Sequence, residues 1–226
     1  MIGQEDFQNL LSEFSSRGVK LIAVSKTKSN EEIMQIYNRG HKIFGENKVQ
    51  EMVGKQAELP EDIQWHMIGN LQSNKVKHIA PFISLIHSVT SFKLLNVIDN
   101  QAYENDRVID CLLQVKIAAE DTKSGFSKEA LLTLLLSEEY KALKHVRIIG
   151  LMGMASFASD EGIVRREFED LNNLFQNIRR EFFSNDEQFR QLSIGMSGDY
   201  IVAIEEGSTM VRIGSLIFGE RHYSSS

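Results

Sequence analysis

Short apolar runs of the kind found in buried parallel strands recur eight times along the chain, and segments with the apolar spacing of an amphipathic helix lie between them. The apolar runs cover about residues 19–26, 41–45, 63–69, 83–89, 107–117, 146–154, 190–196 and 209–218. The helical segments cover residues 31–37, 49–57, 73–79, 92–100, 130–136, 164–183 and 200–205. This alternation predicts a parallel sheet with crossover helices rather than separate blocks of helices and strands.

One more helix is expected before the first apolar run, over residues 4–17, where Gly18 follows as a stop signal. Eight strand–helix units are the number that closes a (β/α)8 barrel of the TIM type. The alternative is an open doubly wound sheet, but the G-x-G-x-x-G loop of that fold is absent after the first run. We therefore expect an α/β fold in which residues 1–226 form a single (β/α)8 barrel domain with an extra N-terminal helix.

The charge and the cysteine count limit the classes of partner. The formal net charge is −6, so nothing draws the whole molecule to nucleic acid or to an anionic membrane. Cys111 is the one cysteine, which excludes a disulfide framework and fits a reducing compartment. The N-terminus resembles no signal peptide, no apolar run is long enough for a membrane span, and the histidines lack metal-ligand spacing. We expect a cytoplasmic protein without a metal site.

The first apolar run, residues 21–26 (LIAVSK), ends on Lys26. Lysine is a poor strand residue and is rarely buried without a partner. One interpretation is a lysine that extends from the strand end into water. The other is a Schiff-base lysine, whose amine is partly desolvated and crowded by the nearby cation of Lys28, so that a neutral fraction can attack an aldehyde.

The loops after the seventh and eighth runs have the composition of a phosphate site. Residues 193–199 (SIGMSGD) leave a strand and lead into the helical segment 200–205, and residues 211–215 (VRIGS) end the eighth run. Hydroxyls and backbone amides at a helix N-terminus suit a phosphate, and barrels often bind phosphate in these two loops. The alternative is an ordinary serine cap beside a tight glycine turn.

Arg212 is expected to point into the barrel, because Met210, Arg212 and Gly214 alternate with two apolar residues that would face the helices. A buried guanidinium cannot lose its charge and needs a hydrogen-bond acceptor or a ligand. A structural salt bridge, for example to Glu46, is the alternative to a ligand.

A Schiff-base lysine, two phosphate loops and an inward arginine together describe a pyridoxal phosphate (PLP) site. Lys26 would bind the aldehyde, the two loops would bind the phosphate, and Arg212 would face the pyridine nitrogen. A permanently charged donor at that nitrogen keeps it unprotonated, which makes the ring a weaker electron sink. Extensive carbanion chemistry is therefore disfavoured.

Motifs in the same order over nearly the whole chain resemble those of the pyridoxal phosphate homeostasis protein family. They are AVSK (23–26), FGEN (44–47), WHMIG (65–69), LQSNK (71–75), KSGF (123–126), GLM (150–152), LSIGMSGD (192–199) and GSTMVRIG (207–214). The resemblance implies a barrel like the N-terminal domain of alanine racemase, with the cofactor held as an aldimine on Lys26 and Arg212 beside the pyridine nitrogen. It implies that Asn47 and Met196 flank the ring. It implies phosphate contacts from Ser193, Ser197, Gly214 and Ser215.

Two classes of function are compatible with such a site. A carrier would hold pyridoxal 5'-phosphate for vitamin B6 homeostasis by buffering, delivery or sensing, without dedicated turnover, and apo PLP-dependent enzymes would be its candidate partners. An enzyme would be an amino-acid racemase or lyase. A two-base racemase needs a second acid/base group, which alanine racemases bring from a C-terminal β domain. The chain ends about ten residues after the eighth run, so we expect no such domain, a carrier rather than an enzyme, and a monomer.

Neither His66 nor the tyrosines are expected to take part in the chemistry. His66 closes a strand, where a histidine is often simply packed, and we assign it no catalytic role. None of the tyrosines is expected at the site, because they fall on predicted helices or on the tail. They are Tyr37, Tyr103, Tyr140, Tyr200 and Tyr223. A phosphosugar aldolase with Lys26 as its Schiff-base residue is a third possible function, and absorbance would distinguish it, since only the cofactor linkage is yellow.

Overall fold

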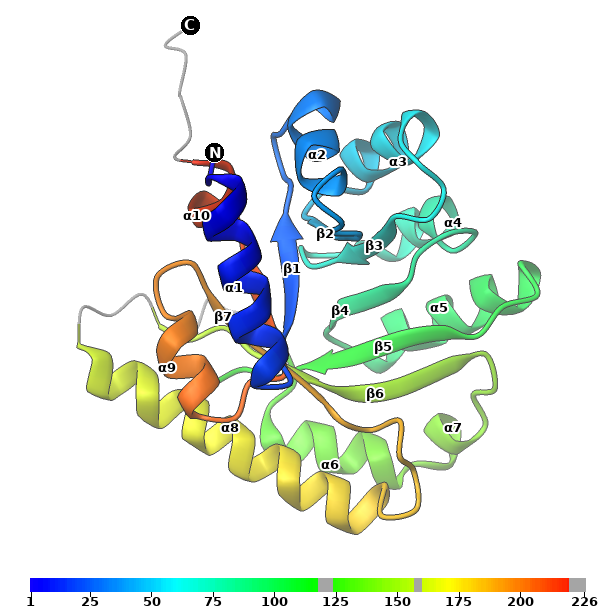
Figure 1. The fold of residues 1–226 in the computed structure, drawn as a ribbon. Coiled ribbons are helices and arrows are strands. Elements are labelled where there is room, and N and C mark those ends of the chain that lie inside the picture. Colours follow the sequence, from blue (N-terminus) through cyan, green and yellow to red (C-terminus); the bar gives the residue numbers. More distant parts are fainter. Residues whose placement is uncertain (118–123, 157–159, 220–226) are drawn as a thin grey trace, which may run out of the picture.

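The structure is a computed structural model that describes residues 1–117, 124–156 and 160–219. Eight parallel strands pair in sequence order, and β1 also pairs with β8, which closes a barrel (Figure 1). The strands are β1 (Lys20–Val24), β2 (Ile43–Glu46), β3 (Gln64–Met67), β4 (Leu85–Val89), β5 (Ile109–Gln114), β6 (Val146–Met152), β7 (Gln191–Met196) and β8 (Met210–Ile213). The expected (β/α)8 barrel is confirmed, and the open sheet is wrong because its first and last strands would not pair.

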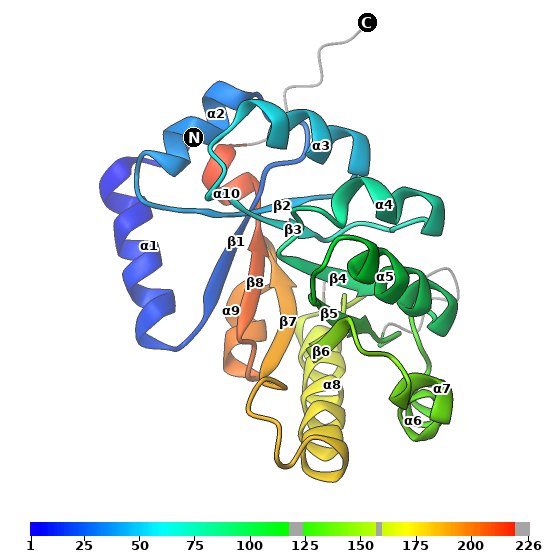
Figure 2. The same cartoon turned by 90° about the vertical axis from the view of Figure 1, so that its right-hand side faces the viewer.

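Helices surround the barrel on the outside (Figures 1 and 2). They are α1 (Gln4–Ser16), α2 (Asn30–Tyr37), α3 (Val49–Glu58), η1 (Ser73–Lys75), α4 (Val76–Ile79), α5 (Phe92–Glu104), α6 (Lys128–Leu136), α7 (Glu138–Lys141), α8 (Glu161–Phe182), α9 (Tyr200–Glu205) and α10 (Ser215–Phe218). The last apolar run, expected over 209–218, is a strand only to Ile213 and continues as α10. Periodicity alone does not separate a short strand from a short buried helix.

The alternation of side chains along each strand divides the apolar residues into two cores. On β1, Ile22 lies inside the barrel, whereas Leu21 and Ala23 belong to the larger core between the strands and the helices. The inner cluster also contains Leu85, Leu112, Ile149, Met152 and Met210. Because both faces of each strand are covered, the strands are nearly continuous apolar runs.

The extra N-terminal helix α1 lies beside β1 and buries Phe7, Leu10 and Phe14 (Figure 1). Just before it, the Ile2 amide donates a hydrogen bond to the carbonyl of Ile217 on α10, with an N···O distance of 2.8 Å. The start of the chain is thereby attached to the segment that follows the last strand.

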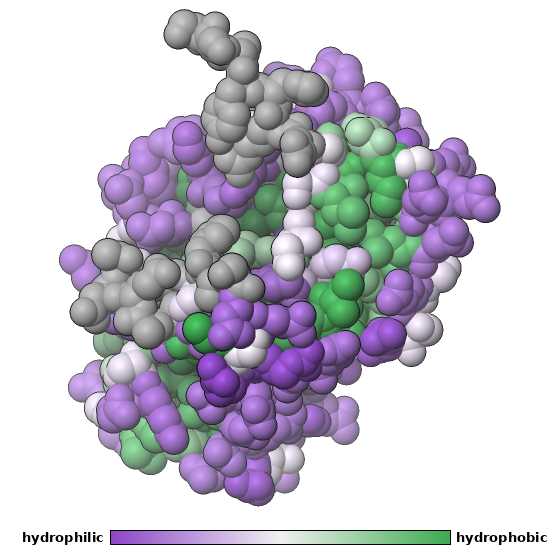
Figure 3. Space-filling view, turned by 90° about the vertical axis from the view of Figure 1, so that its left-hand side faces the viewer, coloured by the Kyte–Doolittle hydropathy of each residue, from purple (hydrophilic) through white to green (hydrophobic). Residues whose placement is uncertain are grey.

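The surface is mainly polar on the face seen in Figure 3, where hydrophobic side chains show only in patches. The large exposed hydrophobic residues of the described ranges lie on different elements, as single exposed side chains commonly do. They are Met1, Tyr103, Val108, Leu136, Ile163, Ile201 and Leu216. Within these same ranges, no helix combines the length and the apolar character needed to cross a bilayer.

Gly150 on β6 gives a test of the barrel packing. Its φ is 155°, and a Cβ atom there would lie 1.7 Å from the carbonyl oxygen of Gln191 on β7. We expect Gly150→Ala to lower the free energy of unfolding by at least about 2 kcal/mol, because the backbone of β7 must move. A Cβ atom at Gly54 on α3 would have no neighbour within 4 Å, so Gly54→Ala should raise the free energy of unfolding by up to about 1 kcal/mol. Urea denaturation measures both, and equal effects would contradict the packing.

Candidate functional site

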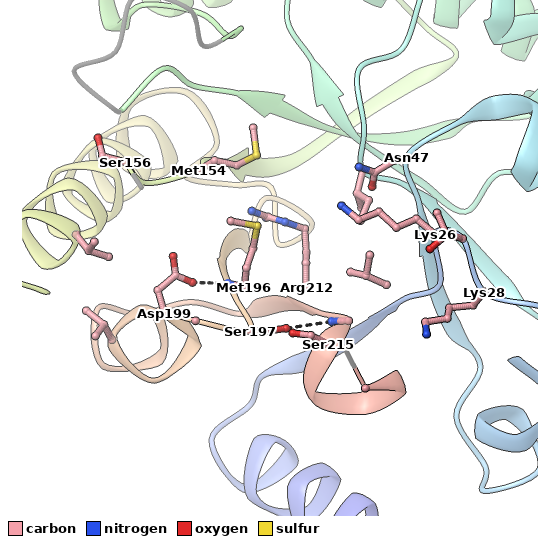
Figure 4. A pocket seen from close by; sticks show the side chains of 18 of the residues that line it. Lys26, Lys28, Asn47, Met154, Ser156, Met196, Ser197, Asp199, Arg212 and Ser215 are labelled. Atoms are coloured by element: carbon pink, nitrogen blue, oxygen red, sulfur yellow. Dashed lines mark hydrogen bonds between the residues drawn. The ribbon is translucent and has the colours of Figure 1, made fainter. Parts of the chain in front are cut away.

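A pocket of about 710 Å³ opens at the carboxyl ends of the strands (Figure 4). This volume is typical of sites for small molecules, and the position is the one at which (β/α)8 barrels carry their sites. The lining residues come from the ends of six strands and from the helices and loops that follow them. They are Val24, Lys26, Thr27, Lys28, Asn47, Ile68, Met154, Ser156, Glu161, Val164, Met196, Ser197, Gly198, Asp199, Val202, Arg212, Gly214, Ser215 and Gly219.

The pocket brings together most of the residues proposed from the sequence. Lys26, Asn47, Met196, Ser197, Arg212, Gly214 and Ser215 all line it. Ser193 does not, because its side chain is fully buried beneath the pocket. His66 is also buried and does not line the pocket. Lys123 of the KSGF motif and Tyr223 lie outside the described residues.

Lys26 follows β1 in the inward register. Ile22 lies in the barrel interior and Val24 lines the pocket, so the side chain two positions further on continues the same face. Figure 4 shows the Lys26 side chain beside Asn47, with its amine directed into the pocket on the side opposite Asp199. The ammonium of Lys28 points elsewhere, to Glu32 Oε1 at 3.1 Å and to the Phe218 carbonyl at 3.5 Å, so the expected crowding of Lys26 by Lys28 is not seen.

The loops after β7 and β8 are joined to each other. The Gly214 amide donates a hydrogen bond to Ser197 Oγ at 3.2 Å, and Ser215 lies beside this contact at the start of α10 (Figure 4). Asp199 closes the β7 turn by accepting a hydrogen bond from the Met196 amide at 2.5 Å. Hydroxyl and amide groups from two loops therefore converge on one side of the pocket.

Gly195 allows β7 and α9 to approach closely. Its φ is 93°, and a Cβ atom at this position would lie 2.6 Å from the Cβ of Ala203 on α9. The ladder between β7 and β8 shifts register between Ser193 and Met196. Met196 and Ser197, which follow this shift, line the pocket.

Arg212 points into the barrel as expected, since Met210 lies in the inner cluster and Val211 and Ile213 lie in the outer core. Its guanidinium donates from Nη1 to the carbonyl and hydroxyl oxygens of Ser193 at 2.8 and 2.6 Å. Nη2 donates to the Gly153 carbonyl at 2.9 Å. Burial lowers the pKa of Arg212 to about 10, with the charge of Asp199 acting in the opposite direction, so the side chain stays charged at neutral pH.

The salt bridge considered between Arg212 and Glu46 does not form. Glu46 is fully buried on the outer face of β2 and pairs with Lys55 of α3 at 2.7 Å. Arg212 instead donates to neutral oxygen acceptors on Ser193 and Gly153, which satisfy the hydrogen-bonding demand of a buried guanidinium without a carboxylate in direct contact.

Ser193 supports Arg212 and is connected to two histidines. Its Oγ lies 3.0 Å from His87 Nδ1, and His87 Nε2 lies 3.0 Å from His66 Nδ1. Because the guanidinium can only donate, Ser193 Oγ accepts a hydrogen bond from it, and the serine hydroxyl can in turn donate to an unprotonated His87 Nδ1. In that tautomer His87 carries its proton on Nε2 and donates to His66 Nδ1.

Burial keeps both histidines neutral, as this chain of hydrogen bonds requires. It lowers the pKa of His66 to about 3, helped by the positive charge of Lys20 and by the neighbouring His41. Burial also places the pKa of His87 well below its usual value, helped by His66 and Arg212. His87 was not predicted from the sequence. Its inward position, two residues after Leu85 on an apolar strand, was the available signal.

Comparisons with known proteins give consistent results. Residues 5–222 match the family model described as the alanine racemase N-terminal domain. The pyridoxal phosphate homeostasis protein of Aquifex aeolicus is 42% identical over 205 residues, which are 90% of this chain and 88% of that protein. PipY of Synechococcus elongatus, solved without PLP, is similar with a TM-score of 0.88 and 34% identity over 96% of this chain and 99% of that chain. Its structure with PLP bound has a TM-score of 0.82 and 33% identity, covering 92% and 98%.

The low pKa of His66 predicts how stability depends on pH. The unfolded chain binds a proton at this imidazole below pH 6.5, whereas the folded chain binds it only near pH 3, so acid favours unfolding. As the pH falls below 6.5, the free energy of unfolding should decrease by about 1.4 kcal/mol per pH unit. The expected loss between pH 6.5 and 5 is about 2 kcal/mol. Urea denaturation at both pH values should show a smaller loss for His66→Gln. An equal loss in both proteins would contradict the assignment.

Proposed function

The chain belongs to the pyridoxal phosphate homeostasis protein family, with the fold of the alanine racemase N-terminal domain, and we propose that it holds pyridoxal phosphate on Lys26 as a carrier in vitamin B6 homeostasis. The observation that carries the proposal is the placement of Lys26, Arg212 and the serine-containing loops on different sides of one pocket. Relatives at 35–42% identity are named as homeostasis proteins and not as enzymes.

The residues of the pocket fit the chemical groups of this cofactor. Once bound, pyridoxal phosphate supplies an aldehyde that condenses with a primary amine. Lys26 would provide the primary amine that holds the cofactor through its aldehyde carbon. We propose that Asn47 and Met196, which line the pocket, contact the ring, and that Val24 and Ile68 form apolar walls.

We propose that Ser197, Ser215 and the backbone of Gly214 bind the phosphate. The hydrogen bond between Gly214 and Ser197 already brings the two loops within contact of each other. The first amides of a helix have no acceptor within the helix, so the start of α10 adds donors on the same side. Ser193 is too deeply buried for the direct contact first assigned to it, and we propose that it acts through Arg212.

Arg212 supports a carrier rather than an enzyme. Two of its donors on Nη1 and one on Nη2 are used by Ser193 and Gly153, and we propose that it turns a remaining N–H to the pyridine nitrogen. A donor of fixed charge keeps that nitrogen unprotonated and weakens the electron sink. The titratable residues among the described lining are Lys26, Lys28, Glu161, Asp199 and Arg212. No tyrosine, histidine or cysteine of the described ranges lines the pocket to serve as the second acid/base of a racemase.

We further propose that residues 1–226 act as one cofactor-binding domain and as a monomer that exchanges pyridoxal phosphate with apo PLP-dependent enzymes. A cytoplasmic location is supported by Cys111, which is a free and buried thiol, as expected in a reducing compartment.

An absorbance experiment tests the role of Lys26. Wild-type protein incubated with pyridoxal phosphate should develop a yellow band, which Lys26→Ala should abolish, because the absorbing linkage requires that amine. Lys28→Ala is the matched control, and it should keep the band because the Lys28 ammonium is directed to Glu32. Borohydride reduction followed by peptide mass spectrometry should place the label on Lys26.

Two outcomes would overturn the carrier proposal. A wild type that stays colourless with added pyridoxal phosphate would exclude the cofactor role and favour the phosphosugar aldolase. Steady racemisation or cleavage of single L-amino acids by the yellow protein would show that it is a PLP-dependent enzyme. A yellow protein with neither product supports a carrier.

A further inference from the structure

A largely buried charge cluster lies outside the barrel wall, next to the turn that follows β1 and contains Lys26. Lys55 of α3 is 7% exposed, and its ammonium donates to Glu46 Oε1 at 2.7 Å, to Glu51 Oε1 at 2.6 Å and to the Ser25 carbonyl at 2.8 Å. Three donors thus meet three acceptors. We call Lys55, Glu46 and Glu51 the Lys55 clamp.

The Lys55 clamp holds the backbone on both sides of Lys26. Before it, Ser25 gives its carbonyl to Lys55 and its hydroxyl to Glu46 Oε1, at 2.6 Å. After it, the Thr27 amide donates to Glu51 Oε1 at 2.5 Å. The residue proposed to bind the cofactor therefore lies between two anchored neighbours.

Thr27 needs such an anchor because its φ is 64°. A β-branched residue rarely adopts this left-handed conformation, which persists only where surrounding contacts impose it. The turn is completed by the Lys28 amide, which bonds to the Ser25 carbonyl at 3.0 Å. Loss of the Glu51 contact would allow the turn to relax and the Lys26 side chain to change direction.

Stability alone does not explain why the Lys55 clamp is present. Buried ion pairs can often be replaced by well-packed apolar residues without loss, because removing two charges from water is costly. Glu46 Oε2 is buried without a hydrogen-bond partner in the described structure, so the cluster does not satisfy all of its own groups. What the cluster does provide is hydrogen bonds to Ser25 and Thr27, on either side of Lys26.

We propose that Lys55 is a positioning residue, which acts with Glu46 and Glu51 to fix Ser25 and Thr27 and so directs the Lys26 amine into the pocket. The inference rests on the proposed function of Lys26. It predicts that weakening the Lys55 clamp slows bond formation at Lys26 even when the pocket residues are unchanged.

The first test uses Glu51, which is 23% exposed and can be replaced without opening the core. Glu51→Ala removes the acceptor of the Thr27 amide, whereas Glu51→Gln keeps an oxygen in its place. Glu58→Ala is the matched control, because it removes a carboxylate at the end of the same helix that accepts a hydrogen bond from Asn30 Nδ2 and not from the Thr27 amide. We measure the rate at which pyridoxal phosphate and borohydride label Lys26, and, without the cofactor, the hydrogen exchange of the Thr27 amide by NMR.

Glu51→Ala should label Lys26 about 10-fold more slowly, since small misplacements of a reacting group cause losses of this order or larger. Its Thr27 amide should exchange at least about 10-fold faster because its acceptor is lost. Glu51→Gln and Glu58→Ala should behave like the wild type in both measurements.

Lys55 is tested with a double variant because Lys55→Met alone would leave the Glu46 carboxylate buried without its partner charge. Lys55→Met with Glu46→Gln removes both charges, and it should fold but label Lys26 slowly. The proposed role of the Lys55 clamp would be overturned if both Glu51→Ala and the folded double variant showed the labelling and exchange rates of the wild type. A wild type that is not labelled at Lys26 would instead overturn the proposed function, and the clamp's role with it.

Discussion

The hydrogen-bonded pairing of β1 with β8 is the contact on which the site depends. Ile22 lies opposite Arg212 in this ladder, so the first and last strands meet although they are separated by almost the whole chain. Closure brings the end of β1, which carries Lys26, next to the loops after β7 and β8. Parallel strands in a barrel all end on one face, and the polar residues that follow them therefore gather in one pocket.

Two buried polar networks support opposite sides of this pocket. Inside the barrel, His66, His87 and Ser193 hold Arg212, and outside the barrel wall the Lys55 clamp holds the turn around Lys26. Burying polar and charged groups in this way costs more desolvation free energy than burying apolar side chains would. Both networks end on a residue that lines the pocket. Their common effect is to fix the direction of a side chain that has several rotatable bonds.

The arrangement is compatible with the proposed carrier function of this alanine racemase fold. The proposed linkage needs a well-placed amine, and we propose that the clamped turn supplies it. Catalysis on the bound group would in addition need a protonated pyridine nitrogen or a second acid/base, and Arg212 and the described lining of the pocket favour neither. Firm positioning with weak activation is what storage of a reactive aldehyde requires.

The sequence by itself determined the barrel and most of the pocket, because strand alternation and the residues at strand ends are local properties. Lys26, Asn47, Arg212 and the serine-containing loops could be placed in this way. Only the tertiary structure decided that Ser193 supports Arg212, that Glu46 pairs with Lys55, and that His87 connects to Ser193. These contacts join side chains on different elements, up to 106 residues apart. No local pattern encodes them, because they depend on which buried donor meets which acceptor once the barrel has closed.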